Sequence, residues 1–275
     1  MKFGFVTCVQ LGLSCMEAIY QAGGHLDLAL TLEDSRSAQK AGRVYLDDFC
    51  RQRSIPLLKI CHINDASVVA AIRSHQLDWL FIIGWSQIAS AEVLASSCCG
   101  VLGMHPTLLP EGRGRAAIPW AILKRLPRTG VTLFRLAEGV DTGPVVAQKE
   151  IRLSPASDAS WLYNQVTAAH SELMFEVMPA LMTGLLVPMP QDENRATIWP
   201  GRKPDDGRID VTGSVHDAEC LVRAVTRPYP GAFFEIEGRR TIIWKARVVP
   251  YRTTFPGFLF NDGYLEFLDY KASGT

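Results

Sequence analysis

The chain has 275 residues, with 28 basic and 28 acidic side chains and a formal net charge of zero. This balance provides no general attraction to nucleic acid or to an anionic membrane, so a polyanion is not the expected partner. The seven cysteines lack the CxxC spacing of a zinc site, and no apolar run is long enough to span a bilayer, so we expect a cytoplasmic protein without a metal site.

Short apolar runs alternate with amphipathic segments through the first half of the chain, which is typical of repeated βα units and a mostly parallel sheet. Strands are expected at 2–7, 26–33, 56–60 and 78–84, with helices at 11–22, 40–53 and 66–76 between them. Asp65 stands where the cap of the third helix is expected. The run 78–84 is apolar without alternation, so we expect both of its faces to be buried.

The second half begins with a strand at 100–105 and an antiparallel pair at 129–136 and 143–153. A long helix over 157–182 follows, and His170 continues its apolar stripe as a packing residue. A short helix near 214–226 and strands within 231–249 and 257–270 finish the chain, the last pair turning at 261–263.

These elements predict an α/β protein with a Rossmann-like, mostly parallel sheet flanked by helices and a small C-terminal β-rich domain. The segment 186–206 is rich in proline, glycine and charge, which indicates a linker. We therefore expect a catalytic domain at 1–185, a linker at 186–206 and a small domain at 207–275.

One histidine and one aspartate stand out as a candidate catalytic pair. His105 ends the strand 100–105, and open α/β sheets bind ligands at the carboxyl ends of their strands. Asp141 lies in the glycine-bracketed turn "EGVDTGP". A carboxylate beside an imidazole fixes its tautomer and favours its charged form, so the ring can accept a proton from an attacking amine. A core histidine that is merely hydrogen-bonded is the alternative for His105 alone.

The stretches "GMHPTLLPEGRGRAAIPW" and "TGVTLFRLAEGVDTGPVVAQKEI" resemble the catalytic core of the folate-dependent formyltransferases, over roughly residues 1–185. The stretch "RAVTRPYPGAFFEIEGRRTIIWKARV" further resembles the C-terminal extension of the tRNA and sugar branches of that family. The resemblance implies transfer of a formyl group from 10-formyltetrahydrofolate to a primary amine. It also implies that His105 and Asp141 are the family's catalytic histidine and aspartate.

The chain departs from the family at one position. The family pattern is N-x-H, in which the asparagine amide donates to the formyl oxygen, but here Gly103 precedes Met104 and His105. Loss of one such donor typically costs about 2.7–4 kcal/mol of transition-state stabilisation. We expect a backbone N–H, an ordered water or a polar group from Ser86 and Gln87 to compensate, and we count Gly103 and Gln87 among the catalytic positions.

The resemblance also assigns two binding regions. The folate pocket is assigned to the segment after the strand 78–84 and to the aspartate turn, namely Gly84, Trp85, Gln87, Ile88, Ala137, Glu138, Gly139, Val140 and Asp141. The amine substrate is assigned to Met104, Pro106, Thr107, Arg113 and Arg115, since an arginine fork suits an anionic substrate. For each arginine, bonding to loop carbonyls is the alternative.

The favoured acceptor is the amino group of a nucleotide-linked sugar, because the region 32–49 lacks the lysine- and arginine-rich loop that a tRNA-binding member needs. Methionyl-tRNA formyltransferase and a hydroxyornithine-type small-amine formyltransferase remain alternatives. A third alternative is a member that binds folate or a nucleotide sugar without turnover, because Gly103 replaces the asparagine. The alternating apolar hairpin at 257–270 predicts a homodimer.

Overall fold

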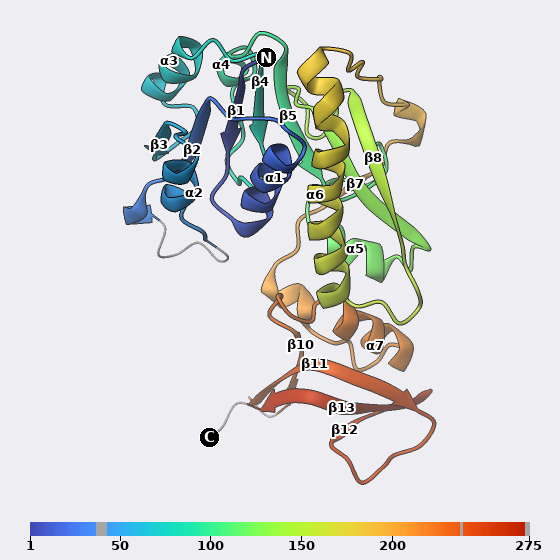
Figure 1. The fold of residues 1–275 in the computed structure, drawn as a ribbon. Coiled ribbons are helices and arrows are strands. Elements are labelled where there is room, and N and C mark those ends of the chain that lie inside the picture. Colours follow the sequence, from blue (N-terminus) through green and yellow to red (C-terminus); the bar gives the residue numbers. More distant parts are fainter. Residues whose placement is uncertain (37–42, 237–238, 273–275) are drawn as a thin grey trace. The chain divides into compact units, whose positions relative to one another are not determined.

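The computed structural model describes residues 1–36, 43–236 and 239–272 (Figure 1). It contains two compact units, and each is assembled from separate stretches of chain. Unit 1 consists of Met1–Arg113, Gly130–Glu150 and Val166–Thr197, and unit 2 of Gly114–Thr129, Ile151–Gln165 and Ile198–Thr275. Each predicted domain is one continuous stretch of the chain, whereas each of these units consists of three stretches that alternate with those of the other.

A seven-stranded sheet has the order β3-β2-β1-β4-β5-β7-β8. Its strands are β1 (Phe3–Val6), β2 (Leu28–Leu32), β3 (Leu57–Ile60), β4 (Trp79–Ile82), β5 (Gly100–His105), β7 (Arg128–Arg135) and β8 (Val145–Arg152). The first five strands of this order are parallel to one another, and β7 is antiparallel to β5. The mostly parallel α/β sheet predicted from the sequence is confirmed.

Both faces of the central strands are buried, as their unbroken apolar sequences predict. Successive side chains of a strand point to opposite faces. On one face, Phe3 and Phe5 of β1 pack against Phe81 of β4, with ring centroids 6.0 and 5.6 Å apart. All three rings are fully buried.

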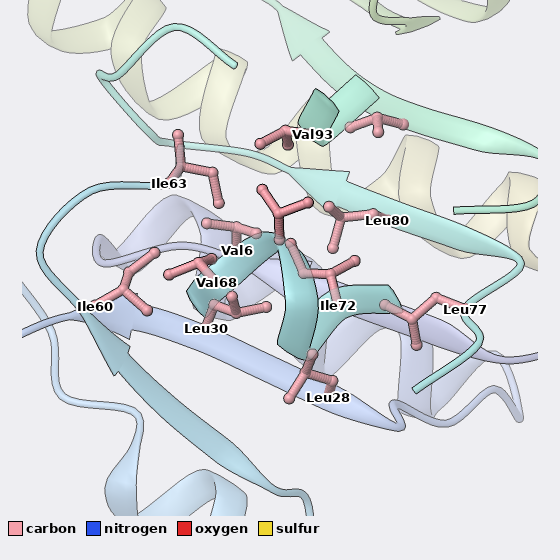
Figure 2. Packing of buried hydrophobic residues seen from close by; sticks show 12 residues of the cluster. Val6, Leu28, Leu30, Ile60, Ile63, Val68, Ile72, Leu77, Leu80 and Val93 are labelled. Atoms are coloured by element: carbon pink, nitrogen blue, oxygen red, sulfur yellow. The ribbon is translucent and has the colours of Figure 1, made fainter. Parts of the chain in front are cut away.

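The opposite face carries an aliphatic cluster that helix α3 (Ala66–Ser74) covers. Figure 2 shows Val68 and Ile72 of α3 among side chains of β1, β2 and β4, including Leu30 and Leu80. Full burial of each such side chain contributes roughly 1.5–3 kcal/mol. Val101 of β5 belongs to the same cluster, so this packing also fixes the strand that ends at His105.

The helices of unit 1 include counterparts of the four helices predicted at 11–22, 40–53, 66–76 and 157–182. They are α1 (Gln10–Gln21), α2 (Asp47–Gln52), α3, the short α4 (Ala91–Leu94), which was not predicted, and the part of α6 (Ala159–Thr183) from Val166 onward. The predicted helix 40–53 is observed only as α2, and its first residues, 40–42, lie outside the described residues.

Unit 2 is built around a four-stranded sheet of order β10-β11-β13-β12 with antiparallel neighbours. Its strands are β10 (Ala232–Ile236), β11 (Arg239–Val249), β12 (Gly257–Phe260) and β13 (Gly263–Ala272), and it also holds α5 (Ala117–Leu123) and α7 (Val215–Ala224). Phe260 pairs with Gly263, so Asn261 and Asp262 form the turn, within the positions 261–263 predicted for it. The small β-rich C-terminal sheet is therefore confirmed.

The remaining elements are short. Two-residue strands β6 (Arg113–Gly114) and β9 (Ile198–Trp199) pair with each other, and 3-10 turns lie at Asp34–Arg36, Glu193–Arg195 and Pro204–Gly207. Within the described ranges, no helix combines the length and apolar character needed to cross a membrane. Over the same ranges, no group of three His, Cys, Asp or Glu side chains could hold a metal ion.

Candidate active site

His105 is the last residue of β5 and is 8% exposed. Its Nε2 lies 2.8 Å from the carbonyl oxygen of Gly112, and because a carbonyl only accepts, Nε2 carries a proton. Its Nδ1 lies 3.5 Å from Oδ2 of Asp141. The ring therefore has a fixed donor on one side and a carboxylate on the other, and the predicted partner is in place.

Asp141 reaches His105 from the loop between β7 and β8. The register pairs His105 with Thr132, so β7 runs back past β5 before the loop returns. Asp141 adopts a left-handed backbone conformation with φ of 54°, which is uncommon for a residue other than glycine. Its side chain is 17% exposed. The carboxylate thus sits at the edge of the site, partly shielded from water.

The backbone of this loop is held by Gln191, from the segment predicted to be a linker. Nε2 of Gln191 donates to the carbonyl oxygens of Asp141 at 2.8 Å and Gly143 at 2.7 Å. Its Oε1 accepts from Nε and Nη2 of Arg113 at 3.1 and 2.8 Å. Gln191 could not be predicted from the sequence, because a glutamine in a polar, proline-rich stretch has no distinguishing local signal.

Arg113 is buried and directed at protein acceptors. Its side chain is 6% exposed, and the guanidinium also donates to both carboxylate oxygens of Glu193, at 2.9 and 2.7 Å. Hydrogen bonding to Glu193 raises the pKa of Arg113, and the same bonds lower the pKa of Glu193. The guanidinium thus bonds the side chains of Gln191 and Glu193 and not the loop carbonyls of the alternative, and its predicted substrate contact stays a prediction.

An apolar group fills the space beside Gly103. A Cβ added at this position would lie 2.6 Å from Cδ2 of Leu136. Gly103 does not adopt a left-handed conformation, so its torsions do not require glycine. The three atoms nearest to such a Cβ all belong to Leu136, so a side chain at position 103 would first have to displace Leu136.

Gln87 makes hydrogen bonds within the protein, and its predicted role as an oxyanion donor stays a prediction. Its Nε2 donates to the carbonyl of Cys61 at 3.0 Å, and its Oε1 accepts from the N–H of Ile63 at 2.8 Å. Trp85 Nε1 lies 3.3 Å from the same oxygen. The side chain therefore links the loop after β4 to the loop after β3.

The other residues assigned to the folate pocket lie in the loop after β4 and in the loop between β7 and β8. Gly84 has φ of 68°, and a Cβ there would lie 2.4 Å from Val9, so only glycine fits. Trp85 packs partly against the aliphatic core, as a wall of the loop. Ile88 is 81% exposed, and the segment 137–140, which contains Ala137, Glu138, Gly139 and Val140, is also exposed. Their exposure leaves them accessible to a ligand.

The residues assigned to the amine substrate are placed unequally. Met104 and Pro106 are partly buried on either side of His105. Thr107 is 1% exposed, and its hydroxyl has no hydrogen-bond partner among the described residues. Arg115 is exposed, belongs to unit 2 and donates its backbone N–H to the carbonyl of Trp199. Its predicted substrate contact stays a prediction.

Comparison with known families identifies the chain. Residues 37–178 match the formyl transferase model, and residues 202–263 match the model of the formyl transferase C-terminal domain. The chain belongs to the formyl transferase family. The resemblance inferred from the motifs around His105 and Asp141 is thereby confirmed.

Solved structures share this fold at low sequence identity. An N-formyltransferase from Helicobacter canadensis in complex with folinic acid and dTDP-3-aminofucose is 14% identical, with a TM-score of 0.73 over 98% of this chain and 100% of that chain. A sugar N-formyltransferase from a Shewanella species is 16% identical, with a TM-score of 0.71 over 88% and 96%. A methionyl-tRNA formyltransferase from Clostridium thermocellum is 17% identical, with a TM-score of 0.61 over 98% and 99%.

Proposed function

We propose that this formyltransferase transfers the formyl group of 10-formyltetrahydrofolate to a primary amine of a nucleotide-linked amino sugar. The observation that carries the chemistry is His105, with Nε2 bound to the Gly112 carbonyl and Nδ1 facing Asp141. The complex of the Helicobacter canadensis enzyme with folinic acid and dTDP-3-aminofucose supports both substrate classes. All seven cysteines are free, which supports a reducing, cytoplasmic location.

In this proposal, Nδ1 of His105 carries out the proton transfer. The amine nitrogen attacks the formyl carbon, which becomes tetrahedral and carries an oxyanion. Nδ1 takes the proton from the new ammonium group, since Nε2 is already protonated and bound to Gly112. The Asp141 carboxylate stabilises the imidazolium that results. Collapse of the oxyanion breaks the bond from the formyl carbon to folate N10, and His105 returns the proton to that nitrogen.

The oxyanion in this proposal has no asparagine amide at position 103. The imidazolium of His105 is then the cation that balances the developing charge, in a site that is largely shielded from water. In this proposal, stabilisation of the oxyanion therefore depends more on His105 and Asp141 than in family members with N-x-H. It favours a functioning enzyme over the alternative of a folate-binding member without turnover.

The test is a formyl-transfer assay with purified protein and 10-formyltetrahydrofolate. Separate reactions contain dTDP-linked 3-amino and 4-amino sugars, hydroxyornithine, and methionine-charged initiator tRNA, and tetrahydrofolate release is followed with His105→Asn as the control. We expect transfer to at least one amino sugar and none to the charged tRNA. Transfer to the tRNA or to hydroxyornithine alone would overturn the sugar assignment, and no transfer to any amine would overturn the enzymatic function.

A further inference from the structure

Two consecutive residues of one loop connect to both members of the catalytic pair. The carbonyl of Gly112 binds His105, and the side chain of Arg113 binds Gln191. Gln191 in turn binds the backbone of the Asp141 loop, whose carboxylate faces His105. The contacts form a closed ring, which we call the 105–191 ring: His105, Gly112, Arg113, Gln191 and Asp141.

We propose that Gln191 is a positioning residue that sets the place of the Asp141 carboxylate against His105, with Arg113 as its anchor. The catalytic readout of this inference rests on the proposed formyl transfer. The left-handed conformation of Asp141 supports it, because such conformations of non-glycine residues persist only where the surroundings fix them. The carbonyls of Asp141 and Gly143 are the groups that Gln191 holds, so the restraint acts on the strained residue itself and on the second residue beyond it.

The chemistry of the contacts calls for glutamine. Arg113 offers only donors, and the two loop carbonyls offer only acceptors, so the connecting side chain must accept at one atom and donate at another. Oε1 of Gln191 accepts from two guanidinium nitrogens, and Nε2 uses both of its hydrogens on the carbonyls. A glutamate would keep the contact to Arg113 but would set a carboxylate oxygen against two carbonyl oxygens.

Gln191→Glu is therefore the matched variant, because it keeps the length and the arginine contact and replaces the two bonds to the loop by repulsion between oxygen atoms. A misplacement of about 1 Å in a catalytic group can cost on the order of 100-fold in rate. We expect Gln191→Glu to lower kcat at least tenfold. Gln165→Glu, the same change at an exposed position of α6, should leave kcat within twofold.

The deciding experiment combines Gln191→Glu with Asp141→Asn. If Gln191 acts through Asp141, the double variant loses no more activity than Asp141→Asn alone, since there is no carboxylate left to position. A structural role elsewhere would multiply the two losses, and that result would overturn the proposal. We therefore expect a lower kcat in each single variant, and nearly the same kcat in Asp141→Asn and in the double variant.

A second measurement does not depend on formyl transfer. Amide hydrogen exchange in the loop 137–143 should be at least tenfold faster in Gln191→Glu than in the parent, while the amides of β1 and β4 stay unchanged. Unchanged exchange in the loop would overturn the positioning role even in an active enzyme. Faster exchange in a protein that forms no formylated amine would remove the proposed function and leave the restraint on Asp141 established.

Discussion

At the scale of single residues, the orientation of His105 depends on a main-chain atom. The Gly112 carbonyl fixes the proton on Nε2 and so leaves Nδ1 as the acceptor on the side of Asp141. Both side chains of the pair could be predicted from the sequence, because a histidine at the end of a strand and an aspartate in a glycine-bracketed turn are local features of the sequence. The carbonyl could not be predicted, since every residue carries one.

Replacement of either member of the pair should remove most of the formyl transfer. We expect His105→Asn and Asp141→Asn to lower kcat about 100-fold or more, on the usual scale of 10²–10⁴ for general acid-base catalysis. Asparagine tolerates the left-handed conformation of position 141, so the loop backbone should persist. Steady-state kinetics with circular dichroism as the folding control measure this, and near-parental turnover in either folded variant would remove the assigned roles.

The space beside Gly103 permits a test of the missing asparagine. Gly103→Asn alone should lower kcat at least tenfold, because its Cβ would lie 2.6 Å from a methyl group of Leu136 and the two side chains compete for one space.

Leu136→Ala combined with Gly103→Asn should recover activity relative to Gly103→Asn, because the shorter side chain admits the amide and returns a donor to the oxyanion. Leu136→Ala alone is the control for lost packing. A folded Gly103→Asn enzyme that turns over faster than the parent would show that Leu136 yields without cost and that the parent simply lacks a donor.

At the scale of elements, the spacing of apolar residues in the sequence predicted most of the strands and helices that pack in the structure. The strand 100–105 and the hairpin 257–270 appear at the predicted positions, because apolar runs and a two-residue Asn-Asp turn are local signals. Helix α5 was missed, since its sequence follows glycines and contains Pro119, yet proline is tolerated in the first turn of a helix. Gln191 was missed because its partners lie 50 and 78 residues away.

Helix α6 carries a buried base that should couple stability to pH. His170 is 3% exposed, and burial lowers its pKa to about 4, with a smaller opposing effect from its hydrogen bond to Val166. An unfolded chain protonates this group near pH 6.5, whereas the folded protein does not, so the folded state is destabilised as the pH falls from 6.5 towards 4.

Between pH 7 and pH 5, His170 should account for a loss of about 2 kcal/mol in the free energy of unfolding. His170→Asn should lower stability at both pH values but lack this part of the pH dependence. Urea denaturation of both proteins at the two pH values measures the difference. Equal pH dependence in parent and variant would show that His170 does not remain neutral in the folded state.

At the scale of the whole molecule, the hairpin of unit 2 remains a candidate for self-association. β12 is an edge strand of its sheet, and large apolar side chains of the hairpin are exposed, with Leu259 at 60%, Leu268 at 47% and Tyr270 at 42%. Unpaired edges and exposed apolar faces favour association with a second copy.

We expect a homodimer by sedimentation velocity and a shift towards monomer in Leu268→Lys. Leu185→Lys, at an exposed position of unit 1, is the matched control and should leave the distribution unchanged. A parent protein that sediments as a monomer across the accessible concentration range would contradict the expectation, as would an unaffected Leu268→Lys dimer.

The interleaving of the two units bears on how such enzymes can be recombined. Within unit 2, Cys220 of α7 donates to the carbonyl of Ile122 in α5, and Arg125 forms an ion pair with Asp217, so α5 and α7 are matched to each other. A chimera made with one crossover in the segment 186–206 would take α5 from one parent and α7 from the other. An exchange of the whole of unit 2 between two such proteins would have to transplant Gly114–Thr129 and Ile151–Gln165 together with the C-terminal stretch Ile198–Thr275, as three simultaneous insertions.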